Sequence, residues 1–309
     1  MRADIILFVK GLAMGAANVI PGVSGGTVAL IAGIYQRLID ALRSFDLVTL
    51  GLVRERRWGE AAGRVDLRFL VGLGAGVAIS LVSLARLLTW LLEHFPVETW
   101  AFFFGLIMGS VWFVGARIDR WGFGPVAGFA IGLVIAGGIA LLPPAAPNPH
   151  PVYLLLCGVA AVVSMILPGL SGSYVMLLMG NYRLVLEAIG EARVMQLLWV
   201  AIGAAVGLVA FSRLISYLFR KHRDLTLALL TGFILGSLLI IWPWKDIGSD
   251  VENVSEYAWR LPDLAVAATW WQIGLIVVGG LAVWVLERSG SIEPASGHDR
   301  SATPPSTGA

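Results

Sequence analysis

Pro21-Gly22-Val23-Ser24-Gly25-Gly26-Thr27 interrupts an apolar stretch near the N-terminus, and Pro168-Gly169-Leu170-Ser171-Gly172-Ser173-Tyr174 repeats it 147 residues later. Each copy is followed at the same distance by a Gly-x-Tyr, which ends at Tyr35 in the first copy and at Tyr182 in the second. Proline cannot continue a helix, and glycine allows tight backbone turns. A helix-breaking motif that occurs twice in an apolar chain is typical of transporters that place polar backbone inside the membrane.

The composition is that of an integral membrane protein. Of the 309 residues, 58% are hydrophobic and 14% are charged, and the mean hydropathy of +0.82 exceeds that of ordinary soluble domains. A helix needs roughly 20 apolar residues to cross a bilayer. Six runs predict transmembrane helices: 69–92, 99–115, 123–142, 194–219, 224–242 and 270–286. The apolar stretches 4–36 and 151–182 are cut by the Pro-Gly motif, and we interpret them as helical hairpins or broken helices.

The duplication extends beyond the motif. Arg86-Leu87, Gly105 and Gly109-Ser110 return at a constant spacing of 127 as Arg213-Leu214, Gly232 and Gly236-Ser237, and residues 132–140 resemble residues 274–282. This spacing is shorter than the 147 residues between the two motifs because the charged loop 37–68 is some twenty residues longer than its counterpart after Tyr182. We therefore expect an all-α polytopic membrane protein built as an inverted repeat. Each half is a Pro-Gly broken re-entrant hairpin plus three transmembrane helices.

This repeat predicts the domain organisation and the topology. The first repeat is 1–142, with its hairpin at 4–36 and a cytoplasmic loop at 37–68. An external linker at 143–150 leads to the second repeat, 151–287. A disordered cytoplasmic tail follows at 288–309. Lysine and arginine concentrate in the loops 37–68, 116–122 and 220–223, which alternate with the basic-poor loops 93–98, 143–150 and 245–268. The positive-inside rule then places both termini in the cytoplasm.

The two breaks predict an anion site. A helix that restarts after each Pro-Gly presents backbone N–H groups and the positive end of its dipole, and such ends bind anions. The alternative is a plain kinked helix whose serine bonds its own backbone. The candidate ligands of the site, from the two breaks and from the two repeated arginines, are Pro21, Gly22, Ser24, Gly25, Gly26, Thr27, Arg86, Gly169, Ser171, Gly172, Ser173, Tyr174 and Arg213.

Arg86 and Arg213 lie about two turns inside their predicted spans, and a guanidinium fork suits a phosphate. The alternative is snorkelling, in which the side chain reaches the headgroup layer. Gly105-x-x-x-Gly109 and Gly232-x-x-x-Gly236 predict close helix packing. Tyr35 and Tyr182 are expected to face the cavity or to anchor at the interface, and Asn18 is a further polar candidate.

Cysteine and histidine usage predicts neither a disulfide nor a metal site. Cys157 is the single cysteine, and the four histidines are scattered without metal-ligand spacing. We expect no metal, no cofactor and no nucleic-acid partner. A homo-oligomer is left open.

The segment Lys10-Gly11-Leu12-Ala13-Met14-Gly15-Ala16-Ala17-Asn18-Val19-Ile20, together with the motif that follows it and the second copy from Ser164 to Tyr174, resembles the bacterial polyprenyl-phosphate transporter family. The resemblance covers most of the chain up to about Glu287. It implies a multi-pass protein of the bacterial inner membrane that returns undecaprenyl phosphate from the outer to the cytoplasmic leaflet. Among the residues of this chain, the resemblance assigns a functional role only to the two motif copies.

The rival interpretation is an enzyme. Pro-Gly-x-Ser also resembles part of the signature of undecaprenyl-pyrophosphate phosphatases, in which an arginine follows the serine and a glutamate pair accompanies it. Gly25 and Gly172 stand where that arginine would be, and no glutamate pair lies in an apolar segment. Hydrolysis needs a positioned acid or base, so we expect a transporter and no enzyme. A small-anion exporter fits the physics of the site equally well.

Overall fold

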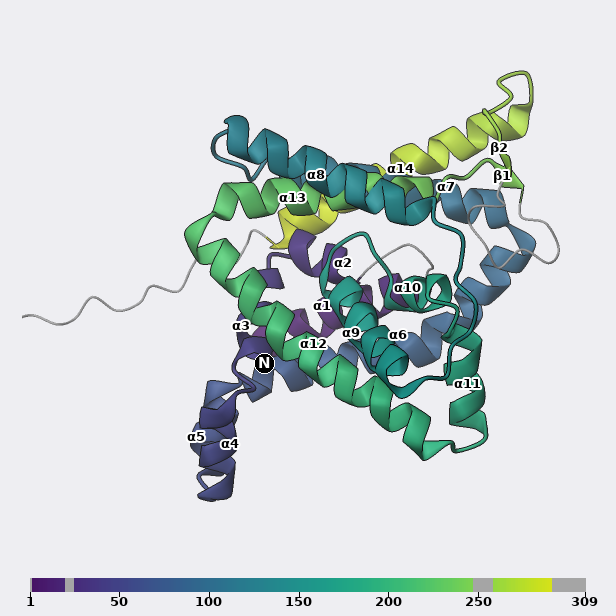
Figure 1. Ribbon diagram of the computed structural model, residues 1–309. Coiled ribbons are helices and arrows are strands. Elements are labelled where there is room, and N and C mark those ends of the chain that lie inside the picture. Colours follow the sequence, from purple (N-terminus) through teal and green to yellow (C-terminus); the bar gives the residue numbers. More distant parts are fainter. Residues whose placement is uncertain (1, 20–24, 247–257, 291–309) are drawn as a thin grey trace, which may run out of the picture.

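The computed structural model describes residues 2–19, 25–246 and 258–290 (Figure 1). The first half of the chain forms helices α1 (Arg2–Val19), α2 (Gly25–Ile31), α3 (Tyr35–Arg43), α4 (Leu47–Arg54), α5 (Trp58–Arg64), α6 (Leu67–His94), α7 (Pro96–Gly115) and α8 (Phe123–Ala140). The second half forms α9 (Pro151–Ile166), α10 (Gly172–Leu178), α11 (Tyr182–Gly190), α12 (Val194–Lys221), α13 (Arg223–Gly236) and α14 (Ala267–Gly290).

The fold is helical, as predicted, apart from one small antiparallel pair of strands. β1 (Lys245–Asp246) pairs with β2 (Ala258–Trp259) in the loop before α14. The run 224–242, which we predicted as one span, is shorter as an α-helix: α13 ends at Gly236 and passes into the 3-10 turn η1 (Ser237–Leu239). The Ser237 hydroxyl donates to the carbonyl of Ile234, and such local bonds compete with the helical pattern.

The protein is a multi-pass membrane protein. By length and composition, four helices of the described residues can cross a membrane: Pro96–Gly115, Phe123–Ala140, Val194–Lys221 and Ala267–Val285. Each coincides with a predicted span. The predicted span 69–92 lies within the 28-residue helix α6, and α9 is a shorter apolar helix of 16 residues.

The predicted break at the second motif is present. Leu167 is extended, with φ −67° and ψ 125°, because the residue before a proline is driven out of the α region. Gly169 follows with φ +93°, a conformation that glycine adopts without strain. The helix then resumes at Gly172 as α10. In the first half, α2 resumes at Gly25, and Pro21, Gly22 and Ser24 lie outside the described residues.

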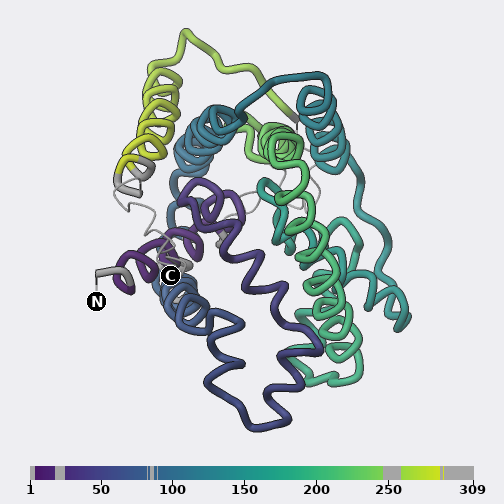
Figure 2. The backbone as a smooth tube through the Cα atoms, turned by 90° about the vertical axis from the view of Figure 1, so that its left-hand side faces the viewer, coloured from purple at the N-terminus to yellow at the C-terminus, as the bar shows by residue number. Residues whose placement is uncertain are grey.

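The long helices pack in pairs, two of them within a half of the chain and two of them between the halves. α1 lies along α6 and α9 along α12, while α7 pairs with α14 and α8 with α13 (Figure 2). The predicted small-residue packing is confirmed. A side chain at Gly105 would collide with the Ile276 backbone on α14, and one at Gly232 would collide with the Phe129 backbone on α8. The glycines therefore let these helix backbones touch.

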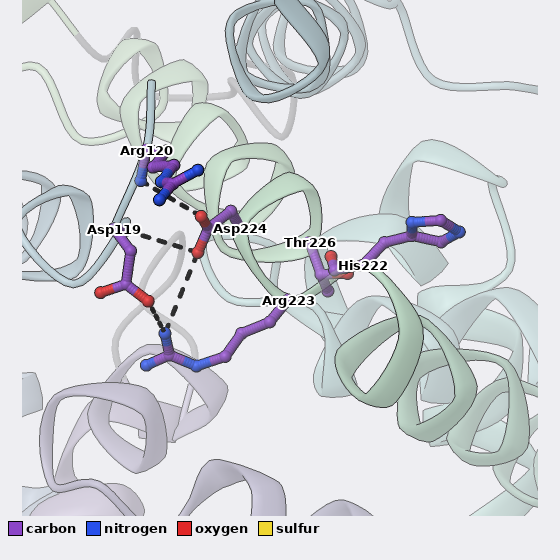
Figure 3. A network of polar contacts seen from close by, with 6 residues as sticks. All are labelled: Asp119, Arg120, His222, Arg223, Asp224 and Thr226. Carbon is purple, nitrogen blue, oxygen red and sulfur yellow. Dashed lines mark hydrogen bonds and ion pairs between the residues drawn. The ribbon is translucent and has the colours of Figure 1, made fainter. Parts of the chain in front are cut away.

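The basic-rich loops gather at one end of the bundle. Arg223 pairs with Asp119 at 3.1 Å, and the Asp224 carboxylate accepts from the backbone N–H groups of Asp119 and Arg120 (Figure 3). These contacts tie the loop 116–122 to the start of α13. The last turn of α3 reaches the same end, because Asp40 accepts a hydrogen bond from Ser216 near the end of α12.

The basic-poor loops meet at the other end of α7. Glu98 accepts a bond from Gln272 on α14, and Gln272 accepts one from Trp244. In the linker between the halves, the Asn181 side chain bonds the backbone N–H and carbonyl of Asn148. The loops thus separate into two groups, as the alternation of charge in the sequence predicts.

Candidate functional site

The two motif copies touch each other in the core. Thr27, the third residue of α2, accepts a hydrogen bond on Oγ1 from the backbone N–H of Gly169, at 2.9 Å. The Thr27 side chain is fully buried. A buried N–H without a partner costs free energy, and at the second break the first motif supplies that partner. The structure therefore brings Thr27 and Gly169 together.

A second bond joins the same two regions. The hydroxyl of Tyr35, at the start of α3, donates to the carbonyl of Ile166, at 3.0 Å. Ile166 is the last residue of α9, and the carbonyls at the end of a helix lack partners within the helix. Tyr35 is buried and packs against the ring of Phe219. It therefore links the two halves of the chain, and it also lines the small cavity described below, as one of our two expectations for Tyr35 predicts.

The second break is also held from the side of α13. A Cβ atom at Gly169 would lie 2.8 Å from the Phe233 carbonyl oxygen and 3.0 Å from the Ser237 hydroxyl. No larger residue fits there without moving the backbone of α13. Gly236-Ser237, the repeated pair of the second half, thus packs beside the break.

The serines of the second motif bond each other. Ser171 caps the start of α10 without a side-chain bond to the backbone, and its hydroxyl lies 2.8 Å from that of Ser173. Ser171 is buried, whereas Ser173 is exposed. Tyr174 is buried and donates to the carbonyl of Ala140 at the end of α8, at 3.3 Å. The Tyr174 hydroxyl therefore holds the end of α8 against α10. Tyr182 lies at the surface.

A small cavity of about 220 Å³ adjoins the first motif. Gly25, Gly26 and Tyr35 line it from the first half, and Met165, Ile166 and Leu208 line it from the second. The volume lies below the roughly 300–1,000 Å³ of typical drug-sized sites.

Arg213 lies elsewhere. It lines a larger cavity of about 810 Å³ together with residues of α4 and α5, and no motif residue lines that cavity. The main chain of Arg86 lies in α6, eight residues before the helix end, just as Arg213 lies eight residues before the end of α12. The side chains of Arg86 and Asn18 lie outside the described part of the structure.

Arg117 is a residue whose role was not predicted. We counted it only as a positive charge of the loop 116–122, but its guanidinium donates to the carbonyls of Leu30 at 3.1 Å and Ile31 at 3.4 Å. These are the last residues of α2, where carbonyls need donors and a cation is favoured. The ring of Phe113 stacks on the same guanidinium, 4.3 Å away. The only signal in the sequence was a cation close to the end of α7.

Comparison with known proteins finds relatives over most of the chain. The model of a family described as undecaprenyl phosphate translocase-like matches residues 14–258, a range that contains both motifs. A polyprenyl-phosphate transporter from Vibrio cholerae is 41% identical over 77% of this chain and 78% of its own length. Another polyprenyl-phosphate transporter, from Staphylococcus aureus, is 32% identical over 77% of this chain and 86% of its own. No solved structure matches the chain significantly.

Proposed function

We propose that this chain, which belongs to the undecaprenyl phosphate translocase-like family, moves polyprenyl phosphate from the outer to the cytoplasmic leaflet of the bacterial inner membrane. The observation that carries the proposal is the bond between Thr27 and Gly169. Two helix breaks that meet inside a membrane protein put polar backbone where a phosphate headgroup must cross the hydrocarbon.

We propose the inverted repeat as the frame for this transport. Equivalent helices have equal lengths in the two halves: seven residues in α2 and α10, nine in α3 and α11, and 28 in α6 and α12. The reciprocal pairing of α7 with α14 and of α8 with α13 supports the same relationship. The proposed units are 1–142 and 151–287, with α1–α2 and α9–α10 as re-entrant hairpins from opposite sides.

The proposed orientation places the basic end of the bundle in the cytoplasm, with both termini there. Labelling of single cysteines tests it, after the buried Cys157 has been replaced by serine. Gly59→Cys in α5 and Ala146→Cys in the linker should react from opposite faces of the membrane. Reaction from the same face would contradict the inverted arrangement.

The proposed headgroup site consists of the motif residues around the two breaks. Its described members are Gly25, Gly26 and Thr27 on α2, and Ser171 and Ser173 at the start of α10. In alternating access, the two hairpins shift against each other and the phosphate passes between them. Arg86 and Arg213 serve, in this proposal, as the cations on the outer and inner sides. Their equal positions in two 28-residue helices support the assignment.

The geometry at Gly172 favours transport over hydrolysis. In the rival phosphatase pattern an arginine follows the serine, but a Cβ atom at Gly172 would lie 2.6 Å from the Met165 side chain and 2.8 Å from the Ala161 carbonyl oxygen. The position is too crowded for an arginine.

Reconstitution into liposomes tests the proposed function. We expect the purified protein to move a labelled polyprenyl phosphate between leaflets without releasing phosphate from polyprenyl pyrophosphate. Phosphate release would indicate the enzyme. Transport of free phosphate without any movement of the lipid would indicate the small-anion exporter.

A further inference from the structure

The 810 Å³ cavity lies apart from the paired breaks, between α12 and a projecting pair of short helices, α4 and α5. We call this pair the arm; it projects from the bundle at the lower left of Figure 1. The arm belongs to the loop 37–68, by which the first half of the chain exceeds the second. The cavity is called the arm groove below.

The wall of the arm groove is apolar. Leu47, Leu50 and Trp58 line it from the arm, and Val209 lines it from α12. Leu50 remains 63% exposed and Trp58 62% exposed, so the groove is open along one side. An open apolar surface of this kind beside a membrane-spanning helix is suited to a hydrocarbon chain. The volume falls within the roughly 300–1,000 Å³ of typical ligand sites.

One cation faces this apolar surface. Arg213 lines the groove from an exposed position on α12. In the part of the chain that the structure describes, no carboxylate pairs with Arg213 and no hydrogen bond holds its side chain. An ionised side chain two turns inside an apolar helix is costly without a counter-ion.

Asp46, the acidic residue of the groove, is engaged elsewhere. It caps α4 by accepting a bond from the backbone N–H of Thr49, and it pairs with Arg64 at 2.7 Å. The bond from Thr49 and the contact with Arg64 lower the pKa of Asp46 to about 2. Asp46 therefore stays ionised and paired, and Arg213 is left for an external anion.

We propose that the arm groove is a binding site for polyprenyl phosphate at the basic end of the bundle, with the phosphate on Arg213 and the first isoprene units along Leu50, Trp58 and Val209. The identity of the lipid rests on the proposed function. A phosphate monoester fits better than the phosphodiester of a bulk phospholipid, because it carries up to two charges and leaves three oxygens for the guanidinium fork. The groove is then where the lipid is loaded or released, before or after the paired breaks.

Site-specific photo-crosslinking tests this inference on the full-length protein in nanodiscs. A benzophenone amino acid is placed at Leu50, which lines the groove, or at Val48, a residue of the same helix that is similarly exposed but does not line it. With labelled polyprenyl phosphate, we expect strong crosslinking at position 50 and little at position 48. Unlabelled polyprenyl phosphate should compete, and phosphatidylglycerol should not.

Substitutions at arginine give the second arm of the test. Arg213→Gln should weaken the crosslink at position 50 about tenfold or more, because it removes a charged hydrogen bond. Arg57→Gln is the matched control, since Arg57 pairs with Glu60 outside the groove. Equal crosslinking at positions 48 and 50, competition by phosphatidylglycerol, or no effect of Arg213→Gln would overturn the inference. If the protein moves the lipid but gives no crosslink at position 50, the groove is not a lipid site, although the proposed transport stands. If the crosslink forms but the lipid does not move, the groove binds the lipid and only the proposed transport is refuted.

Discussion

The Thr27 hydroxyl accepts a hydrogen bond from the Gly169 N–H across 142 residues of sequence, and this bond joins the two copies of one repeated motif. The second copy breaks a helix between Ile166 and Gly172 and thereby leaves backbone groups that need partners. Here a partner for one break comes from the other copy. We therefore expect a change at Thr27 to affect the backbone at Gly169.

Replacing Thr27 by valine should uncouple the breaks. The change keeps the shape of the side chain but leaves the Gly169 N–H buried without its acceptor, which costs about 1–3 kcal/mol. We expect a lower melting temperature in detergent and slower lipid movement in liposomes. Thr27→Ser keeps the hydroxyl and should retain most of both. A Thr27→Val protein as stable and as active as the parent would show that the bond does not matter.

Gly169→Ala should be more damaging than Thr27→Val. The alanine must adopt φ +93°, and its Cβ would press on the Phe233 carbonyl and the Ser237 hydroxyl. We expect a marked loss of folded protein in a size-exclusion profile. Gly33→Ala separates the two causes, because Gly33 has φ +71° but open space around its Cβ. If both variants behaved alike, strain alone and not crowding would explain the loss.

Arg117 should matter for the first broken helix. Arg117→Gln removes the charge that faces the carbonyls of Leu30 and Ile31, at a cost of about 1–2 kcal/mol. We expect reduced lipid movement and a modest fall in thermal stability. Arg120→Gln in the same loop is the control, since Arg120 contacts Asp224 through its backbone N–H. A larger effect of Arg120→Gln than of Arg117→Gln would contradict the assigned role.

Lys245 should make stability depend on pH. It lies in the loop before α14, donates to the Ile240 carbonyl and sits 3.9 Å over the ring of Trp100. Burial lowers the pKa of Lys245 from its ordinary value of 10.5 to about 7. Between these values the unfolded chain binds more protons than the folded one, so the free energy of unfolding rises with pH.

The matched variant isolates this contribution. Between pH 7 and pH 10, the melting temperature of the parent should rise relative to that of Lys245→Met. Below pH 7 the difference between the two should stop changing. A difference that stays constant across the whole window would mean that the lysine remains charged, held by Trp100.

Much of the fold could be predicted from local patterns. Pro168 and the glycine after it end α9 because of their own backbone preferences, whatever surrounds them. Gly105 and Gly232 predict close helix contacts because small residues in apolar helices let two backbones approach. The alternation of basic-rich loops likewise predicts which loops gather at one end. These features depend on residues close together in the sequence or on simple composition.

The remaining features depend on tertiary contacts. Two contacts have no signal in the local sequence, because the partners are far apart in the chain. Arg117 and Ile31 at the end of α2 are 86 residues apart, and Tyr35 and Ile166 are 131 residues apart. The place of Arg213 could not be predicted either. The sequence indicates the depth of Arg213 in α12, but it predicts only a charged loop where the arm forms the other wall of the cavity.

If the lipid phosphate occupies the region around the two breaks, as proposed, it should protect a cysteine placed there from alkylation. Ser173→Cys, in a Cys157→Ser background, places a thiol at the exposed serine beside Ser171. We expect polyprenyl phosphate, but not phosphatidylglycerol, to slow the alkylation of this cysteine in proteoliposomes, and to leave that of Gly190→Cys on α11 unaffected. An unchanged alkylation rate at position 173 with saturating polyprenyl phosphate, in a protein that still moves the lipid, would contradict it.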